Sequence, residues 1–232
     1  MLLILTALFT SALSAVLGMA GGLVLMAISA TLLPVAAAMV FQGSVQLVAN
    51  GGRALMLWRH IRWRSVGTYA AGAALAMLAM RQVAWRPDAD AVLLLLGLTP
   101  FAARLLPPFD FTRRDHAIFC GALVAGVQIL AGVAGPLLDV FFVDSPLDRR
   151  GVVACKAATQ TLSHAIKLGF WAPLLVNGEP SPALILGACV AAVLGTALGR
   201  RLLERFSEGS FRKATRWTVM GIGAACIAQS LW

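Results

Sequence analysis

The sequence predicts an all-α polytopic membrane protein made of two homologous four-segment halves. Three observations lead to this fold class. First, 59% of the 232 residues are hydrophobic and only 12% are charged, whereas soluble domains carry about 25% charged residues. Second, long apolar segments follow one another with short polar interruptions, as membrane-crossing helices do. Third, the chain aligns with itself when it is displaced by 114 residues. This composition excludes a soluble enzyme, a disordered chain and a fibrous repeat.

Apolar segments define the expected helices. In chain order they are 2–17, 22–33, 36–58, 65–85, 90–106, 116–131, 136–146, 151–175, 182–203 and 214–231. Glycine clusters at Gly18–Gly22 and Gly132–Pro136 interrupt two pairs of segments, because glycine disfavours helix and proline lacks a backbone donor. Each of these pairs is expected to be a broken helix that either crosses once or folds back as a re-entrant hairpin. A signal peptide carries a basic residue before its apolar stretch. The first segment has none before it, so we expect it to be retained.

The internal repeat relates polar residues as well as glycines. At the displacement of 114, GMAGGL at 18–23 falls on GVAGPL at 132–137. The polar residues Gln46, Asn50 and Arg53 fall on Gln160, His164 and Lys167. We therefore expect one membrane repeat over 1–106 and a second over 115–232. The polar stretch 107–114 is the expected linker within a single transmembrane domain.

Basic residues lie in clusters between the apolar segments, at 59–64, 104–114, 149–150 and 200–216. Six passes plus two re-entrant hairpins would place all four clusters on the cytoplasmic side, as the positive-inside rule favours. The two halves would then be oppositely oriented, like the inverted repeats of many secondary transporters. The alternative is eight plain passes with a parallel repeat. Basic loops also explain the net charge of +9, so no nucleic-acid partner is expected.

Ionisable and amide side chains within the apolar segments are the candidate binding residues, because such groups are costly at bilayer depth and default to functional roles. Gln46, Asn50 and Arg53 share one helix face by their spacing, and the repeat duplicates that face in the second half. If the two faces meet, they form one pocket for a small oxyanion, to which glycine-rich helix starts add backbone N–H groups. The expected substrate-binding residues are Arg53, Lys167, Gln46, Asn50, Gln160, His164, Gly21, Gly22 and Gly135.

Asp139 and Lys156 are the candidates for coupling or charge pairing, and Asp139 could neutralise either Lys156 or Lys167. His164 or Asp139 could carry proton coupling, since imidazole titrates near pH 6.5. The alternatives are purely structural: Arg53 would extend its charged group to the membrane interface, and the amides would only form hydrogen bonds between helices. The four cysteines contain no CxxC pair, so we expect no metal site or cofactor. The sequence has no HExxH and no GxSxG motif, so we expect no catalytic residue.

Several segments resemble the sulfite exporter TauE/SafE family of membrane permeases. These segments are GMAGGL (18–23), the span from Gln46 to Trp58 with the turn Arg62–Arg64, GVAGPL (132–137), the helix around Thr159–Lys167, and GTALGRRLLERFSEGSFRK (195–213). The sequence departs from the family pattern at Ala20, where glycine is common, and lacks the proline that often follows the first cluster. The resemblance implies a bacterial inner-membrane transporter of small sulfur-containing or organic anions.

The expected function is therefore a permease that is not an enzyme. Export is favoured slightly over import, because a negative-inside potential contributes about 2.3 kcal/mol per charge per 100 mV to the exit of an anion. A non-transporting membrane scaffold and, less favoured, a membrane-embedded enzyme remain as alternatives.

Overall fold

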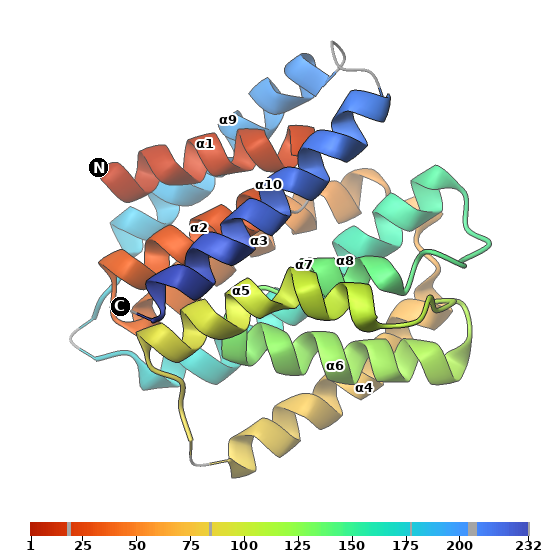
Figure 1. Ribbon diagram of the computed structural model, residues 1–232, viewed down its shortest axis with the longest axis horizontal. Helices are drawn as coiled ribbons and strands as arrows, with labels where there is room; N and C mark the ends of the chain where they lie inside the picture. Colours follow the sequence, from red (N-terminus) through yellow and green to blue (C-terminus); the bar gives the residue numbers. More distant parts are fainter. Residues whose placement is uncertain (18–19, 84, 177, 204–207, 232) are drawn as a thin grey trace.

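The computed structural model (Figure 1) describes the backbone of residues 1–17, 20–83, 85–176, 178–203 and 208–231. It also describes the side chains of these residues, except those of 15–17, 200–203 and 208–216. Every secondary-structure element in the described ranges is helical, so the prediction of an all-α chain is confirmed. The α-helices are α1 (Leu2–Leu17), α2 (Ala20–Leu32), α3 (Val35–Met56), α4 (Trp63–Gln82), α5 (Ala89–Leu105), α6 (Arg114–Ala131), α7 (Gly135–Val140), α8 (Arg149–Trp171), α9 (Pro182–Leu203) and α10 (Glu208–Gln229). Part of the glycine cluster at 18–22, and the side chains of the basic cluster at 200–216, lie outside the described residues.

Local sequence signals account for several helix ends. Asp88 and Asp148 are N-caps, and their carboxylates accept hydrogen bonds from the backbone of Ala91 and Gly151 at 2.8 Å, a strong preference of that position. Gly132 ends α6 in the left-handed region, with φ of 78°. That conformation favours glycine, and a Cβ at this position would also collide with the Met26 side chain.

The segment that follows α6 reverses the direction of the chain. The predicted helix 136–146 is much shorter in the structure, since α7 ends at Val140. Its exit then runs beside the linker, where Phe109 and Phe111 donate backbone hydrogen bonds to Val140 and Phe141 at 3.2 and 2.8 Å. The chain thus leaves α7 next to the point where it approaches α6, so α6 and α7 form a hairpin.

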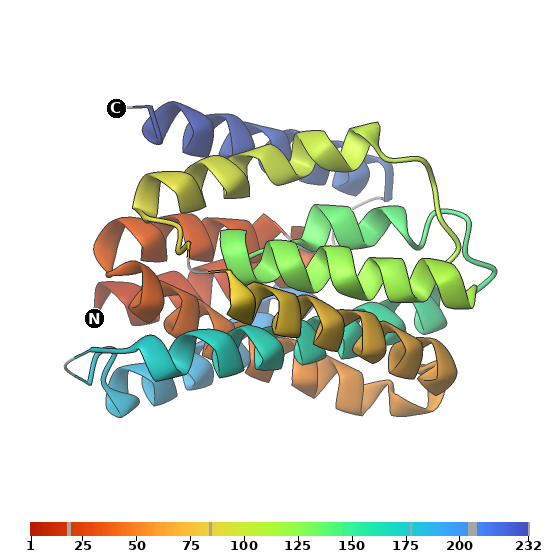
Figure 2. The same ribbon diagram turned by 90° about the horizontal axis from the view of Figure 1, so that it is seen from below.

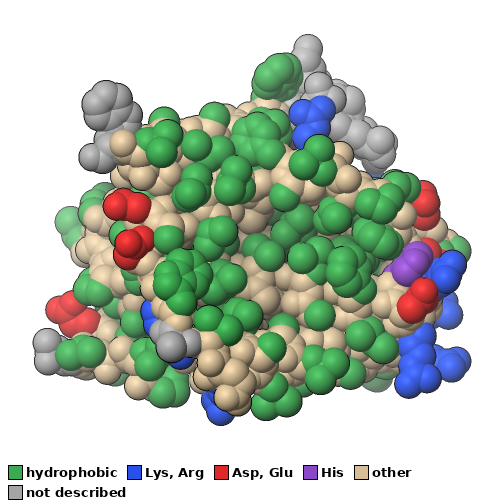
Figure 3. Space-filling view, turned by 60° about the horizontal axis from the view of Figure 1, so that its bottom comes forward, with side chains coloured by type: hydrophobic (Ala, Val, Ile, Leu, Met, Phe, Trp, Pro, Cys, Tyr) green, Lys and Arg blue, Asp and Glu red, His purple; other side chains and the backbone are tan. Residues whose placement is uncertain are grey.

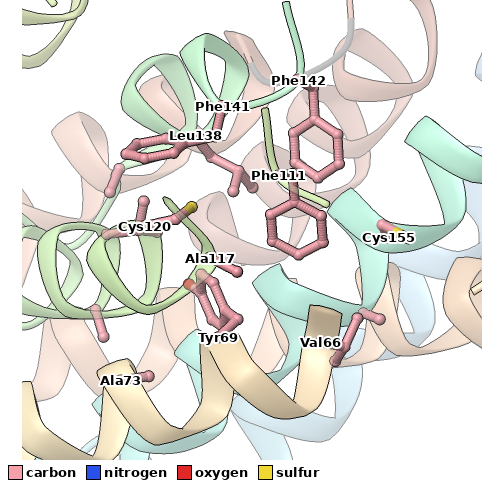
Figure 4. Packing of buried hydrophobic residues seen from close by; sticks show 14 of the residues in the cluster. Val66, Tyr69, Ala73, Phe111, Ala117, Cys120, Leu138, Phe141, Phe142 and Cys155 are labelled. Carbon is pink, nitrogen blue, oxygen red and sulfur yellow. The ribbon is translucent and has the colours of Figure 1, made fainter. Parts of the chain in front are cut away.

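The predicted linker at 107–114 is anchored to the core by its two phenylalanines, Phe109 and Phe111. Phe111 is fully buried, and its ring stacks on Phe142 with centroids 4.6 Å apart. Phe109 stacks on Phe141 at the same distance, with an angle of 11° between the rings. Figure 4 shows Phe111 and Tyr69 in this cluster with the side chains of α6 and α7. Aromatic burial therefore holds the α6–α7 hairpin at this end of the protein.

The two halves interlock through helix pairs. Helix α1 packs along α9, α4 along α6, α3 along α8 and α5 along α10, and each pair takes one helix from each half of the chain (Figures 1 and 2). The central pair α3–α8 is antiparallel, because Gly43 lies against Leu168 whereas Gly51 lies against Thr161. Figure 1 shows α5 and α10 running in opposite directions as well. The halves consequently form one body.

Small residues allow the closest of these contacts. A Cβ at Gly121 of α6 would collide with the backbone carbonyl oxygen of Tyr69 on α4, while one at Gly126 would meet nothing within 4 Å. Gly121→Ala is expected to destabilise the protein by about 1–3 kcal/mol through overpacking. Gly126→Ala, on the same helix, should be neutral or stabilising, because alanine favours helix over glycine. Thermal unfolding in detergent measures both, and equal melting temperatures would contradict this packing.

The surface separates apolar and charged regions. Figure 3 shows hydrophobic side chains covering the middle of one face, with most charged side chains towards its ends. Exposed apolar residues include Leu75, Leu78, Leu186, Val190 and Leu194, a distribution that suits a lipid environment. By length and composition, two described helical stretches could cross a membrane, Arg114–Ala131 and Pro182–Gly199, and shorter apolar helices lie at 2–14, 20–32 and 217–229.

Candidate functional site

A cavity of about 30 Å³ lies among α1, α2, α3, α8, α9 and the junction between α6 and α7. It brings together many of the residues predicted from the repeat. Its predicted lining residues are Gly22, Gln46, Asn50, Arg53, Gly135, Gln160 and His164. The faces of α3 and α8 meet here because the two helices pack against each other. Lys167 and Gly21 were predicted with them but do not line the cavity.

The α3 side of the cavity is an ordered row of amides. Asn50 donates to the backbone oxygen of Gln46 at 3.0 Å and to its Oε1 atom at 3.2 Å. Both side chains are buried, with 3% and 8% exposure. Gly22 lets α2 approach this row, because a Cβ there would lie 3.3 Å from Gln46 Nε2. Hydrogen bonds within α3 therefore fix the Asn50 amide against Gln46, one helical turn before Arg53.

Arg53 is partly buried and faces the cavity at the last turn of α3. Within the described residues its guanidinium forms no hydrogen bond or ion pair, and no Asp or Glu lines the cavity. A charged group removed from water is costly unless it is paired. This wall of the cavity therefore carries a positive charge that the described part of the protein leaves unpaired.

Lys167 has a different environment from its repeat partner Arg53. Its side chain is fully buried, and its Nζ atom donates hydrogen bonds to Gln42 Oε1 and to the backbone oxygen of Gly132, the latter at 3.0 Å. Gln42 in turn donates to the backbone oxygen of Gly22 at 3.4 Å. The long lysine side chain thus reaches the α6–α7 junction, and it ties α8 to both glycine-containing segments.

Gln128 of α6 is a cavity residue that the sequence reasoning missed. Its Oε1 atom accepts from the backbone of Ala134 at 3.1 Å, and its Nε2 atom donates to the oxygen of Gly132 at 3.2 Å. The same Nε2 atom lies 2.9 Å from Nδ1 of His164. One amide therefore holds the junction and contacts the α8 face. The sequence feature that could have indicated Gln128 is that it is the only amide in the otherwise apolar stretch 117–131.

Asp139 and Lys156 form an ion pair with each other away from the cavity. Both are partly exposed, with 51% and 26% of their side chains accessible. Asp139 thus pairs with Lys156, one of its two expected partners, and Lys167 is satisfied by neutral acceptors instead. Gly21 packs on α1, where a Cβ would collide with the backbone oxygen of Thr10. These residues lie around the cavity rather than in it.

Three hydroxyl residues also line the cavity and were missed by the sequence reasoning, as was Gln42 of α3. The hydroxyl residues are Ser11 and Ser14 of α1 and Thr196 of α9. These helices pack along one another, and Gly195 allows the contact, because a Cβ there would collide with the backbone oxygen of Leu8. Small and hydroxyl residues are common in such helix contacts, so their presence in the sequence did not by itself indicate a site.

A family model described as sulfite exporter TauE/SafE matches residues 3–226, nearly the whole chain. No curated protein and no solved structure matches the chain.

Proposed function

This chain belongs to the sulfite exporter TauE/SafE family, and from that premise we propose that it is a secondary transporter that binds a small anion in the cavity at Arg53. The family is one of membrane transporters of sulfur compounds. The anions that we propose are sulfur oxyanions first, then small organosulfonates and carboxylates. The proposed location is the bacterial cytoplasmic membrane, and the proposed role is not enzymatic.

The charge of Arg53, which no described residue pairs, carries this proposal. A guanidinium binds oxyanions through two parallel N–H groups, and the amides and hydroxyls around it are neutral hydrogen-bonding groups. The cavity of about 30 Å³ has room for roughly two water molecules, each of which needs about 10–15 Å³. Such a volume favours a compact inorganic anion, whereas a larger organosulfonate would require the cavity to widen.

We propose further that the halves are inverted repeats with six passes and two hairpins. Two features support this. The helices that the repeat relates, α3 with α8 and α5 with α10, pack in opposite directions, as a two-fold axis in the membrane plane requires. The α6–α7 hairpin also returns the chain to its starting end, and α2 runs back along α1 in Figure 1.

Cysteine labelling tests this topology. On a background without the native cysteines, single cysteines at Arg62 and Arg149 should be accessible from the cytoplasm, and those at Asp88 and Pro180 from outside. Eight plain passes would instead place positions 62 and 149 on opposite sides and positions 62 and 180 on the same side. The result therefore separates the two arrangements directly, with an impermeant thiol reagent and intact cells.

A transport screen tests the function. Purified protein in proteoliposomes should move at least one of sulfite, thiosulfate, sulfate and methanesulfonate faster than protein-free liposomes do. Absence of transport for every anion, with no effect of any anion on the melting temperature, would favour the scaffold alternative. Accumulation of a chemically altered product would favour a membrane-embedded enzyme.

Coupling is expected to appear as a dependence on membrane potential or on pH. An anion that moves alone carries charge, so its export should respond to an imposed potential by about 2.3 kcal/mol per charge per 100 mV. If His164 takes part in proton coupling, the rate should instead depend on pH. Electroneutral transport with a rate that does not depend on pH would contradict both forms of coupling.

A further inference from the structure

Hydroxyl side chains on α1 fall into two groups. Thr6 and Thr10 donate to backbone oxygens one turn earlier, those of Leu2 and Thr6, at 3.0 and 2.7 Å, which is the usual arrangement in apolar helices. Ser11 lies beside Thr10 and is only 2% exposed, but its Oγ atom has no hydrogen-bond partner among the described residues. A buried polar group normally has a partner. The Ser11 hydroxyl is therefore available for one that the described chain does not supply.

The surroundings of Ser11 indicate what that partner is. Ser11 lines the cavity, as do Ser14 one turn further along α1 and Thr196 of the adjacent helix α9. The hydroxyls of Ser14 and Thr196 also make no hydrogen bond within the part of the chain that the structure describes. Arg53 lines the same cavity from α3. Unused donors thus come from three helices, and they surround a space without carboxylates from the described residues.

We infer that Ser11, assisted by Ser14 and Thr196, is a direct anion-binding residue and forms a hydroxyl wall for the anion held by Arg53. This inference rests on the proposed function and specifies how the cavity holds its ligand. A guanidinium fork binds two oxygen atoms of an anion. The hydroxyls then donate to the remaining oxygens, so the wall selects anions with three or more oxygen atoms. The anion would bridge α3 to the α1–α9 pair.

Titration of sulfite, thiosulfate, sulfate and methanesulfonate into the purified full chain tests the inference. Ser11→Ala should weaken binding of whichever of these anions the wild type binds by about 10- to 100-fold, as expected for a lost hydrogen bond to a charged group. Ser11→Thr keeps the hydroxyl and should retain more affinity than Ser11→Ala. Thr10→Val is the matched control, because it removes a neighbouring hydroxyl whose partner is backbone, and it should leave the affinity unchanged.

The melting temperature without anion separates binding from a structural role. Ser11→Ala should melt at or above the wild-type temperature, because the hydroxyl that it removes has no described partner. If Ser11→Ala binds the anion as tightly as wild type, or if it melts below the wild type without anion, the hydroxyl wall is wrong while the proposed function stands. If the wild type binds none of the four anions, the proposed function fails, and the inference fails with it.

Discussion

Arg53→Ala is expected to weaken anion binding by at least about 1.5–3 kcal/mol, the range for hydrogen bonds to charged groups, or roughly 10- to 150-fold in the dissociation constant. The reason is that Arg53 is the one cationic side chain among the described residues that line the cavity. Arg53→Lys should retain part of the affinity, since lysine keeps the charge but lacks the planar fork. Calorimetry in detergent and initial transport rates in proteoliposomes measure both effects.

Arg59, six residues after Arg53, offers a control for the loss of a positive charge alone. Arg59 lies beyond α3, where its guanidinium stacks over the Trp58 ring at 5.6 Å and does not line the cavity. Arg59→Ala should therefore leave the anion affinity near the wild-type value. If Arg53→Ala is well folded and transports with wild-type rate and affinity, Arg53 is an interfacial anchor and the proposed site is wrong.

Lys167→Met is expected to reduce stability more than affinity, in contrast to Arg53→Met. Methionine fills much of the same volume but cannot donate to Gln42 Oε1 or to Gly132 O. Gly132 O keeps its bond from Gln128, whereas Gln42 Oε1 is left as a buried acceptor without a partner, which costs about 1–3 kcal/mol. Arg53→Met removes a group with no described partner, so the anion-free protein should melt at or above the wild-type temperature. The two substitutions thus separate residues that the repeat makes equivalent.

Thermal unfolding without anion and titration with anion together measure this contrast. Lys167→Met should lower the melting temperature, with a smaller loss of affinity than Arg53→Met. The opposite pattern, in which Lys167→Met melts like wild type and loses as much affinity as Arg53→Met, would show that Lys167 contacts the anion, as the sequence alone predicted.

Part of the candidate site was predictable because it depends on local periodicity. The spacing of Gln46, Asn50 and Arg53 determines a shared face on any regular helix, and the displacement of 114 transfers that face to Gln160 and His164. The α3–α8 contact then brings both faces to one cavity. Whether these residues bind an anion stays a prediction, as does the inverted orientation of the halves.

The remaining residues were not predictable because their roles depend on helices that are distant in sequence. Gln128 and Ser11 look like ordinary polar residues of apolar helices, and only the packing of α1 and α6 around α3 and α8 brings them to the cavity. The repeat also suggested equal roles for Arg53 and Lys167. The tertiary structure distinguishes them, since Lys167 has acceptors within reach and Arg53 has none among the described residues.

The sequence by itself determined the helical class, the approximate helix boundaries, the glycine-marked junction after α6 and the polar faces of α3 and α8, because composition and a period of 3.6 residues act over a few turns. Only the tertiary structure decided that Phe111 of the 107–114 segment is buried, that Asp139 pairs with Lys156, and that Lys167 supports the α6–α7 junction. Those outcomes depend on which donors and acceptors meet across helix contacts, where a buried polar group pairs with any partner in reach.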